Sequence, residues 1–172
     1  MNHKFFAAAV LCFALVTVMA LADVPAASAK AEIMTGTGIE TYAAPPNPTT
    51  PDPLVTGGVA HWTFNNVLRE EASTPLLVGN NSTHMVVVFD PASPTWAGRC
   101  HGTWRLIVDG GLGTWEGTFA GSISLLTGAY DIRSTGKGVS GAVAGMIFVA
   151  RDVNATEAYG EVKGTVIAPH GF

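Results

Sequence analysis

Cysteine is nearly absent from this sequence. The 172 residues contain two cysteines, and Cys12 lies in an apolar N-terminal stretch that we expect to be removed. Cys100 then has no partner within the chain, so an internal disulfide is excluded and stability must come from packing. A free cysteine of this kind is usually a buried small hydrophobe.

Charged side chains are also scarce, at 13% of the residues, and the formal net charge is -4. Lysines and arginines are scattered, and neither sign of charge forms a run. Because binding to a phosphate backbone needs a basic surface, we do not expect nucleic acid as a partner.

Motifs for catalysis and for metal or cofactor binding are missing as well. The segment Gly138-Val139-Ser140-Gly141 lacks the second spacing of a hydrolase nucleophile elbow. The histidines stand singly along the chain, with no pair at ligand spacing. The neighbouring carboxyl groups of Glu70 and Glu71 follow Arg69 in a predicted solvated loop. We therefore expect no metal site and no cofactor.

The N-terminus has the pattern of an export signal. Met1-Asn2-His3-Lys4 is followed by an uncharged apolar run from Phe5 to Ala22. The small-x-small site Ala27-Ser28-Ala29 predicts cleavage after Ala29, and a retained membrane anchor is the alternative. We expect residues 1–29 to be a signal peptide and residues 30–172 to form one secreted domain, extracellular or periplasmic, with membrane contact only through the signal.

The rest of the chain predicts an all-β fold. Short β-branched and aromatic runs are separated by Gly, Asn, Asp or Pro about every eight to twelve residues, and no long amphipathic helical period appears. Interior strand glycines such as Gly117 and Gly164 favour a tightly coiled barrel over a sandwich. We predict a single antiparallel up-and-down β-barrel of about eight strands, with a Pro-rich connector at 43–54 that crosses the barrel rim. The expected strands are 32–42, 58–69, 84–89, 101–109, 114–124, 129–136, 142–151 and 158–168.

The clearest predicted element is a hairpin that turns through 110–113. Pairing Asp109 with Thr114 would set Trp104 opposite Phe119 and Val108 opposite Trp115, which makes one face apolar and aromatic. Arg105 and Glu116 fall on the other face, diagonal to each other and within reach of an ion pair. A solvent-exposed pair of this kind contributes little to stability.

Two segments, 85–89 and 142–150, are apolar on both faces of a strand. A strand that is half exposed to water should alternate, so something must cover the second face. The candidates are the N-terminal segment and a second copy of the chain, and self-association into a homo-oligomer is our preferred interpretation.

Three glycine-rich stretches carry a resemblance to a known group. Residues 113–123 (GTWEGTFAGSI), 136–141 (GKGVSG) and 160–171, which close on Gly-Thr-Val-Ile-Ala-Pro-His-Gly, resemble small secreted bacterial proteins of unknown function. Their barrels are similar to the calycin and allene-oxide-cyclase-like group. The resemblance implies a barrel fold, and it implies no catalytic residue that can be transferred to this chain.

The predicted barrel supports three functional hypotheses. The first is binding of a small apolar ligand inside the barrel, lined by Trp104, Trp115 and Phe119, with Arg105 and Glu116 as polar candidates; the competing interpretation is that these aromatics only fill the core. The second is a barrel isomerase or cyclase acting on an apolar substrate, which requires the charged pair to face inward. The third is an envelope or matrix interaction protein that uses the doubly apolar strands.

Overall fold

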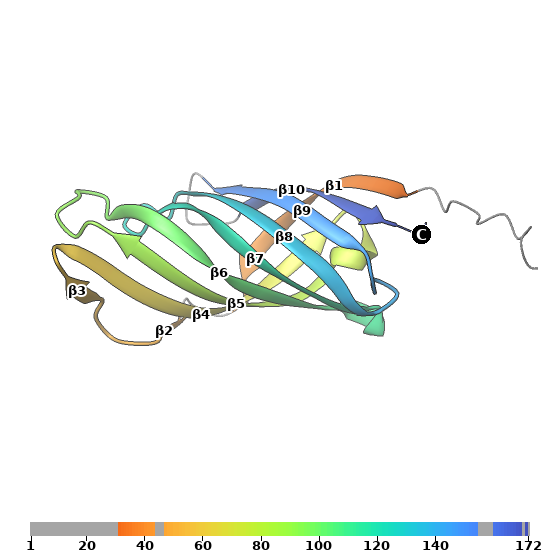
Figure 1. The fold of residues 1–172 in the computed structure, drawn as a ribbon, viewed down its shortest axis with the longest axis horizontal. Coiled ribbons are helices and arrows are strands. Elements are labelled where there is room, and N and C mark those ends of the chain that lie inside the picture. The colour runs from red at the N-terminus through yellow and green to blue at the C-terminus, as the bar shows by residue number, and fades with distance from the viewer. Residues whose placement is uncertain (1–30, 44–46, 155–159, 170, 172) are drawn as a thin grey trace, which may run out of the picture.

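The computed structural model describes residues 31–43, 47–154, 160–169 and 171, so the predicted signal peptide and cleavage site lie outside the described residues. The described chain is all-β, and no helix in it is long and apolar enough to cross a membrane. Figure 1 shows an elongated molecule of twisted strands. The strands are β1 (Glu32–Tyr42), β2 (Asn47–Pro48), β3 (Leu54–Thr56), β4 (Val59–Ala72), β5 (Gly79–Phe89), β6 (Ala97–Val108), β7 (Gly113–Ser124), β8 (Tyr130–Gly141), β9 (Ile147–Asn154) and β10 (Gly160–Ala168), with short 3-10 turns η1 (Pro75–Leu77) and η2 (Asp109–Gly111).

Eight of these strands close into a ring of antiparallel neighbours. From β4 to β10 each strand pairs with the next in sequence, and β1 pairs with both β10 and β4. Glu32 lies opposite Ala168, and Gly38 lies opposite both Val162 and Ala72. Closure through β1 joins the two edges of the sheet, which is the advantage of a barrel over an open sheet. The prediction of an up-and-down barrel of about eight strands is confirmed.

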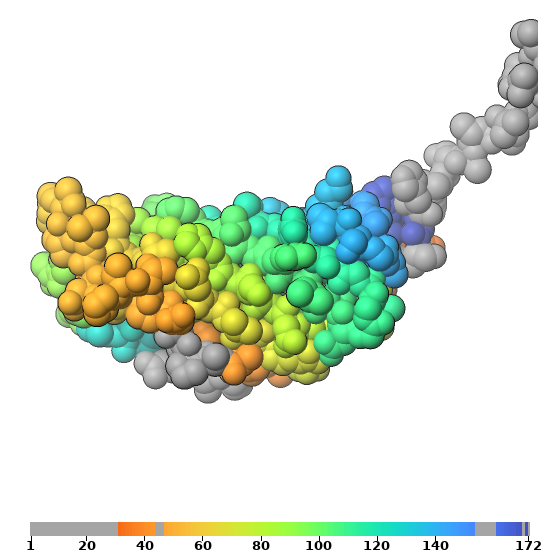
Figure 2. All heavy atoms as spheres, turned by 90° about the horizontal axis from the view of Figure 1, so that it is seen from below, coloured from red at the N-terminus to blue at the C-terminus, as the bar shows by residue number. Residues whose placement is uncertain are grey.

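The described part of the Pro-rich connector lies along β4. The short strands β2 and β3 pair with the first half of β4, while β1 pairs with its second half. The indole Nε1 of Trp62 donates to the carbonyl of Thr50 at 3.0 Å, which fastens the connector to the barrel. Figures 1 and 2 place β2 and β3 on the surface, at the end of the molecule opposite the C-terminus.

Alternation along the strands explains which side chains face the interior. In β4, Phe64, Asn66 and Leu68 are buried, while Asn65 and Val67 are exposed. Successive side chains of a strand point to opposite faces, so the next inward position after Leu68 is residue 70.

Three local predictions are corrected by this pattern. Glu70 and Glu71 lie within β4 and not in a loop, because pairing with β1 and β5 extends the strand to Ala72. β5 begins at Gly79, earlier than the predicted His84, because polar inward residues interrupt its apolar pattern. The run 142–150 divides into a turn and β9, and both Val143 in the turn and Met146 after it are buried in the core.

The hairpin forms with a register that differs from the predicted one by two residues. Trp104 lies opposite Gly117, Leu106 opposite Trp115, and Arg105 directly opposite Glu116. The turn begins one residue earlier than predicted, because Val108 pairs with Gly113. A shift of two keeps every side chain on its predicted face, so the aromatic face of the hairpin is the inner one.

Glycines opposite Trp104 make room for its indole ring. A Cβ atom added at Gly117 would lie 2.6 Å from Cε2 of Trp104, and one added at Gly136 would lie 2.3 Å from its Cζ2. The ring therefore lies flat over two neighbouring strands where any larger residue would displace it. This is the close approach that interior strand glycines permit.

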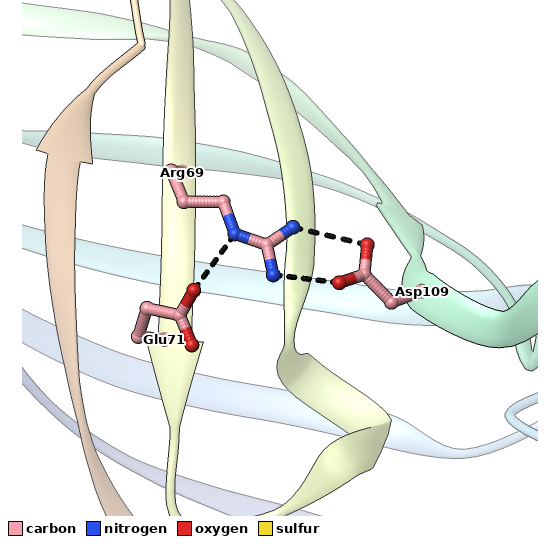
Figure 3. Close-up of polar contacts among 3 residues, drawn as sticks. All are labelled: Arg69, Glu71 and Asp109. Carbon is pink, nitrogen blue, oxygen red and sulfur yellow. Dashed lines mark hydrogen bonds and ion pairs between the residues drawn. The ribbon is translucent and has the colours of Figure 1, made fainter.

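One surface ion-pair group links β4 to the β6–β7 turn (Figure 3). The guanidinium of Arg69 donates to both carboxylate oxygens of Asp109, at 3.0 and 2.6 Å, and its Nε donates to Glu71 at 2.8 Å. Two parallel bonds to one carboxylate fix the geometry of the pair. Arg69 thereby ties the turn to the outer face of β4.

Apolar side chains on the outer face of β9, β1 and β10 remain partly exposed. Ile33, Ile147 and Val149 expose between 42% and 66% of their surface, and Ile167 lies opposite both Ile33 and Ile147. Self-association through such strands stays a prediction.

Candidate functional site

The barrel interior contains a cavity of about 130 Å³. All eight strands of the ring contribute lining residues, together with Ser73 and Thr74 before η1 and Leu77 within it. Most of the wall is apolar, with a polar region where β1, β4, β5, β8 and β9 contribute their side chains. The lining includes Leu68, Met85, Leu106, Ile132, Phe148, Ala150 and Val166 on the apolar side, and Glu40, Tyr42, Asn66, Glu70, Asn81, Tyr130 and Asp152 on the polar side.

Three carboxyl groups, from Glu40, Glu70 and Asp152, meet in this polar region, and we refer to them as the carboxyl cluster. Glu40 of β1 lies directly opposite Glu70 of β4 in the strand register. Asp152 reaches the same place from β9 and is 8% exposed. The side chain of Glu40 lies close enough to both of the other carboxyl groups for hydrogen bonding with each to raise its pKa. Two carboxyl groups can share a hydrogen bond only when one carries a proton, so the cluster retains protons.

Burial is the main cause of the unusual acidity of the carboxyl cluster. It raises the pKa of Glu40 well above its usual value, and the nearby charges of Glu70 and Asp152 raise it further. Burial also raises the pKa of Glu70 and of Asp152, but hydrogen bonds to Asn81 and Glu40 oppose the change at Glu70, and hydrogen bonds to Glu40 and Tyr130 oppose it at Asp152. The pKa of all three carboxyl groups is therefore raised, and a proton that the cluster retains forms an O–H donor to one neighbouring carboxylate oxygen.

Two tyrosines flank the carboxyl cluster. Burial is the largest cause of the raised pKa of Tyr130, and the charges of Asp152 and Glu40 raise it further. Tyr42 is 47% exposed, and its partial burial raises the pKa of its phenol, followed by the charges of Glu40 and Asp152. Both phenols therefore remain protonated donors, and Tyr130 hydrogen-bonds to Asp152.

Several buried acceptors in the cavity wall have no hydrogen-bond partner. These are Oδ1 of Asn66, Oδ1 of Asn81 and Oδ1 of Asp152, on side chains that are 5%, 6% and 8% exposed. Asn81 donates its Nδ2 to Glu70 Oε1 at 2.7 Å, which fixes which end of the amide is the free acceptor. Buried polar atoms are nearly always paired, so unpaired acceptors in a cavity wall indicate a place where a donor binds.

Aromatic rings form the apolar side of the cavity. Trp104 and Phe119, both predicted from the hairpin, line it together with Phe148. The rings of Trp104 and Phe148 meet edge to face with centroids 5.7 Å apart. Trp115 is fully buried within the packed core and does not line the cavity. Its Nε1 donates to the carbonyl of Leu76 at 2.8 Å.

Arg105 and Glu116 lie on the outer face of the barrel. Their side chains are 59% and 54% exposed, and Arg105 Nε lies 3.4 Å from Glu116 Oε1. They line an open depression on the outside, next to His84 and Asn65, whose Nδ1 and Oδ1 are 2.8 Å apart. The structure therefore does not meet the condition that this charged pair face inward for a barrel isomerase.

No group of three or more His, Cys, Asp or Glu side chains in the described part of the chain is arranged to hold a metal ion. Cys100 is buried at 2% exposure, and burial raises the pKa of its thiol to about 11. His61, His84 and His101 are exposed on the outside, and His170 lies outside the described residues.

The carboxyl cluster was missed by the sequence reasoning, although a signal for it exists. Asp152 follows Phe148 and Ala150 at every second position, and Glu70 follows Phe64, Asn66 and Leu68 in the same way. Extending the alternation of the apolar inward residues would have placed both carboxyl groups inside.

Neither the models of protein families nor the curated proteins include a match to this chain. The resemblance to calycin-like and allene-oxide-cyclase-like barrels therefore stays a prediction.

Proposed function

We propose that this protein is exported and binds one small molecule inside its barrel. The observation that carries the proposal is a cavity whose wall contains buried acceptors without partners. Such atoms are rare in a core that is only filled by its own side chains. The acceptors of Asn66, Asn81 and Asp152 are instead completed when a ligand donates hydrogen bonds to them.

The volume of the cavity sets the size of the ligand. The cavity measures about 130 Å³. An apolar cavity of about 150 Å³ in a protein core holds a benzene molecule. The ligand is therefore small, with an apolar part against Trp104, Phe119 and Phe148 and a polar end at the carboxyl cluster.

Native mass spectrometry of the protein, purified gently from the medium or periplasm of an expressing host, tests both parts of the proposal. We expect the intact mass to begin at Lys30 and to include one small molecule that is released on denaturation. A chain that retains residues 1–29 contradicts export with cleavage, and an empty barrel that takes up no small molecule contradicts binding.

A pair of alanine substitutions locates the ligand. Ala150 lines the cavity, so Ala150→Leu should fill part of it and abolish uptake, whereas Ala120→Leu on the exposed outer face should leave uptake unchanged. Far-ultraviolet circular dichroism and the unfolding midpoint show whether each variant is folded. Equal uptake by both variants places the ligand outside the barrel.

A barrel isomerase or cyclase is the second candidate, favoured by the protonated Glu40 beside Tyr130 and Asp152. A carboxyl group whose pKa is raised by burial is suited to general acid catalysis near neutral pH. Incubation of the released molecule with fresh protein distinguishes the candidates, because an enzyme converts it to an isomer of equal mass that separates on chromatography. Recovery of the unchanged molecule supports binding alone.

A further inference from the structure

We propose that the ligand of this cavity is a primary amine bound as its ammonium ion, with the nitrogen at the carboxyl cluster and an apolar body against the aromatic rings. This inference rests on the proposed binding function and specifies its ligand class. It follows from the charge of the wall, from the kind of hydrogen-bonding atoms left free, and from the shape of the apolar side.

The charge of the cavity wall is of one sign. Three carboxyl groups line the cavity, and no lysine, arginine or histidine is among the described residues that do so. An anionic ligand would meet no compensating cation there and would have to be buried beside like charges. A cation, in contrast, gains from each carboxylate that it faces, because the interior screens the attraction less than water does.

The free hydrogen-bonding atoms select the kind of cation. Every buried side-chain atom without a partner in the described residues is an acceptor: Oδ1 of Asn66, Oδ1 of Asn81 and Oδ1 of Asp152. A primary ammonium group carries three N–H donors and no acceptor. A quaternary ammonium group brings the same charge but no donor, and would leave these acceptors unpaired. The wall therefore favours a primary amine.

The opposite wall fits the apolar body. Trp104, Phe119 and Phe148 line the cavity, and their rings also attract a cation near their faces. Benzylamine is a suitable probe, because it joins one primary ammonium group to a single aromatic ring that can pack against the aromatic wall. Benzyl alcohol replaces the ammonium with a neutral hydroxyl on the same ring, and benzoate replaces it with an anion.

Binding of the amine should release protons from the carboxyl cluster. The titratable groups that face the cavity are Glu40 and Tyr42 from β1, Glu70 from β4, Tyr130 from β8 and Asp152 from β9. In the described residues, β5, β6, β7 and β10 contribute no titratable side chain to it. Burial raises the pKa of the three carboxyl groups, so the empty cavity holds protons that an arriving cation displaces.

Titration calorimetry at neutral pH tests the inference on the mature protein. Benzylamine should bind at least tenfold more tightly than benzyl alcohol, and benzoate should not bind. The heat of benzylamine binding should change with the ionisation heat of the buffer, which reports proton release, and its affinity should fall as the pH is lowered into the range where the carboxyl cluster is fully protonated. Benzyl alcohol should show neither effect.

Two isosteric variants test the carboxyl cluster directly. Asp152→Asn and Glu70→Gln should each reduce the preference for benzylamine over benzyl alcohol by about tenfold, which corresponds to about 1.4 kcal/mol. Glu116→Gln on the outer face is the matched control and should leave the preference unchanged. Asp152→Asn and Glu70→Gln remove a charge at constant shape, and binding of benzyl alcohol shows that they are folded.

The outcomes separate the two proposals. Equal affinity for benzylamine and benzyl alcohol refutes the ammonium site while supporting a ligand cavity. A preference for benzylamine that survives both cavity variants places the cation elsewhere and also refutes the site. If none of the probes binds, the amine inference is wrong, while the native mass spectrum still decides whether the barrel holds another molecule.

Discussion

The fit of Trp104 over Gly136 gives the sharpest prediction about stability. In Gly136→Ala the new Cβ would lie 2.3 Å from Cζ2 of Trp104 and 2.6 Å from its Cη2, so the buried indole has to move. Overpacking of this kind costs about 1–3 kcal/mol. Replacing glycine by alanine also restricts the unfolded chain, which offsets about 0.4–1 kcal/mol of that cost. We expect a net loss of about 1–2 kcal/mol.

The assay is urea unfolding followed by tryptophan fluorescence and circular dichroism. In a thermal melt of a chain of this length, a loss of 1 kcal/mol in the free energy of unfolding corresponds to about 4 °C in the melting temperature. The same substitution in a Trp104→Phe background meets a smaller ring that lacks Cζ2 and Cη2 of the indole. Only the backbone oxygen of Glu116, 3.1 Å from the new Cβ, then remains as a tight neighbour, so the cost of the alanine should fall and the double-mutant cycle should show a coupling of about 1 kcal/mol or more. An equal cost in both backgrounds refutes the contact, as does no cost in the native background.

Three further predictions concern the acidic, ionic and thiol groups. Burial raises the pKa of Glu40 in the folded state. The stability that comes from its bound proton is therefore present below the usual carboxyl pKa and is lost as the pH rises through the folded-state pKa. Urea unfolding across that range should show Glu40→Gln to be more stable than the native chain at neutral pH and equally stable in acid. Arg69→Ala removes the paired hydrogen bonds to Asp109. The resulting fall in melting temperature should be measurable in low salt and should shrink in high salt. A salt-independent loss would instead point to packing by the arginine stem. Cys100 should not react with a thiol reagent at mildly alkaline pH until the protein unfolds, because burial shields the thiol and raises its pKa to about 11. Rapid labelling of the native protein would contradict its burial.

The fold was predictable because its signals are local and periodic. Alternation in 160–168 and the turn glycines Gly110 and Gly111 define strands and their ends without knowledge of the rest of the chain. The first strand was predicted with the bounds observed, Glu32 to Tyr42. The hairpin register was not, because the choice between two registers that keep the same faces depends on the geometry of the turn.

The site was harder to predict, because it is assembled from strands that are distant in sequence. Arg105 and Glu116 were predicted as a charged pair within one hairpin, and the hairpin places both side chains on the outer face of the barrel. Glu40, Glu70 and Asp152 come together only through the ring closure between β1 and β4 and through the shared interior of the barrel. Polar residues at inward positions look like loop residues when each strand is considered alone, and this explains why Glu70 was assigned to a loop.

The closing of the ring by β1 has a consequence for how the chain acquires its structure. β4 to β9 form a meander of neighbouring hairpins, whose contacts are close in sequence and can form early. β1 (Glu32–Tyr42) has to join β10 (Gly160–Ala168), a partner that is distant in the sequence. Glu40 can meet Glu70 as soon as β1 pairs with β4, but Asp152 on β9 reaches them only when the two ends of the meander come together, so the approach of all three acidic groups waits for that long-range contact.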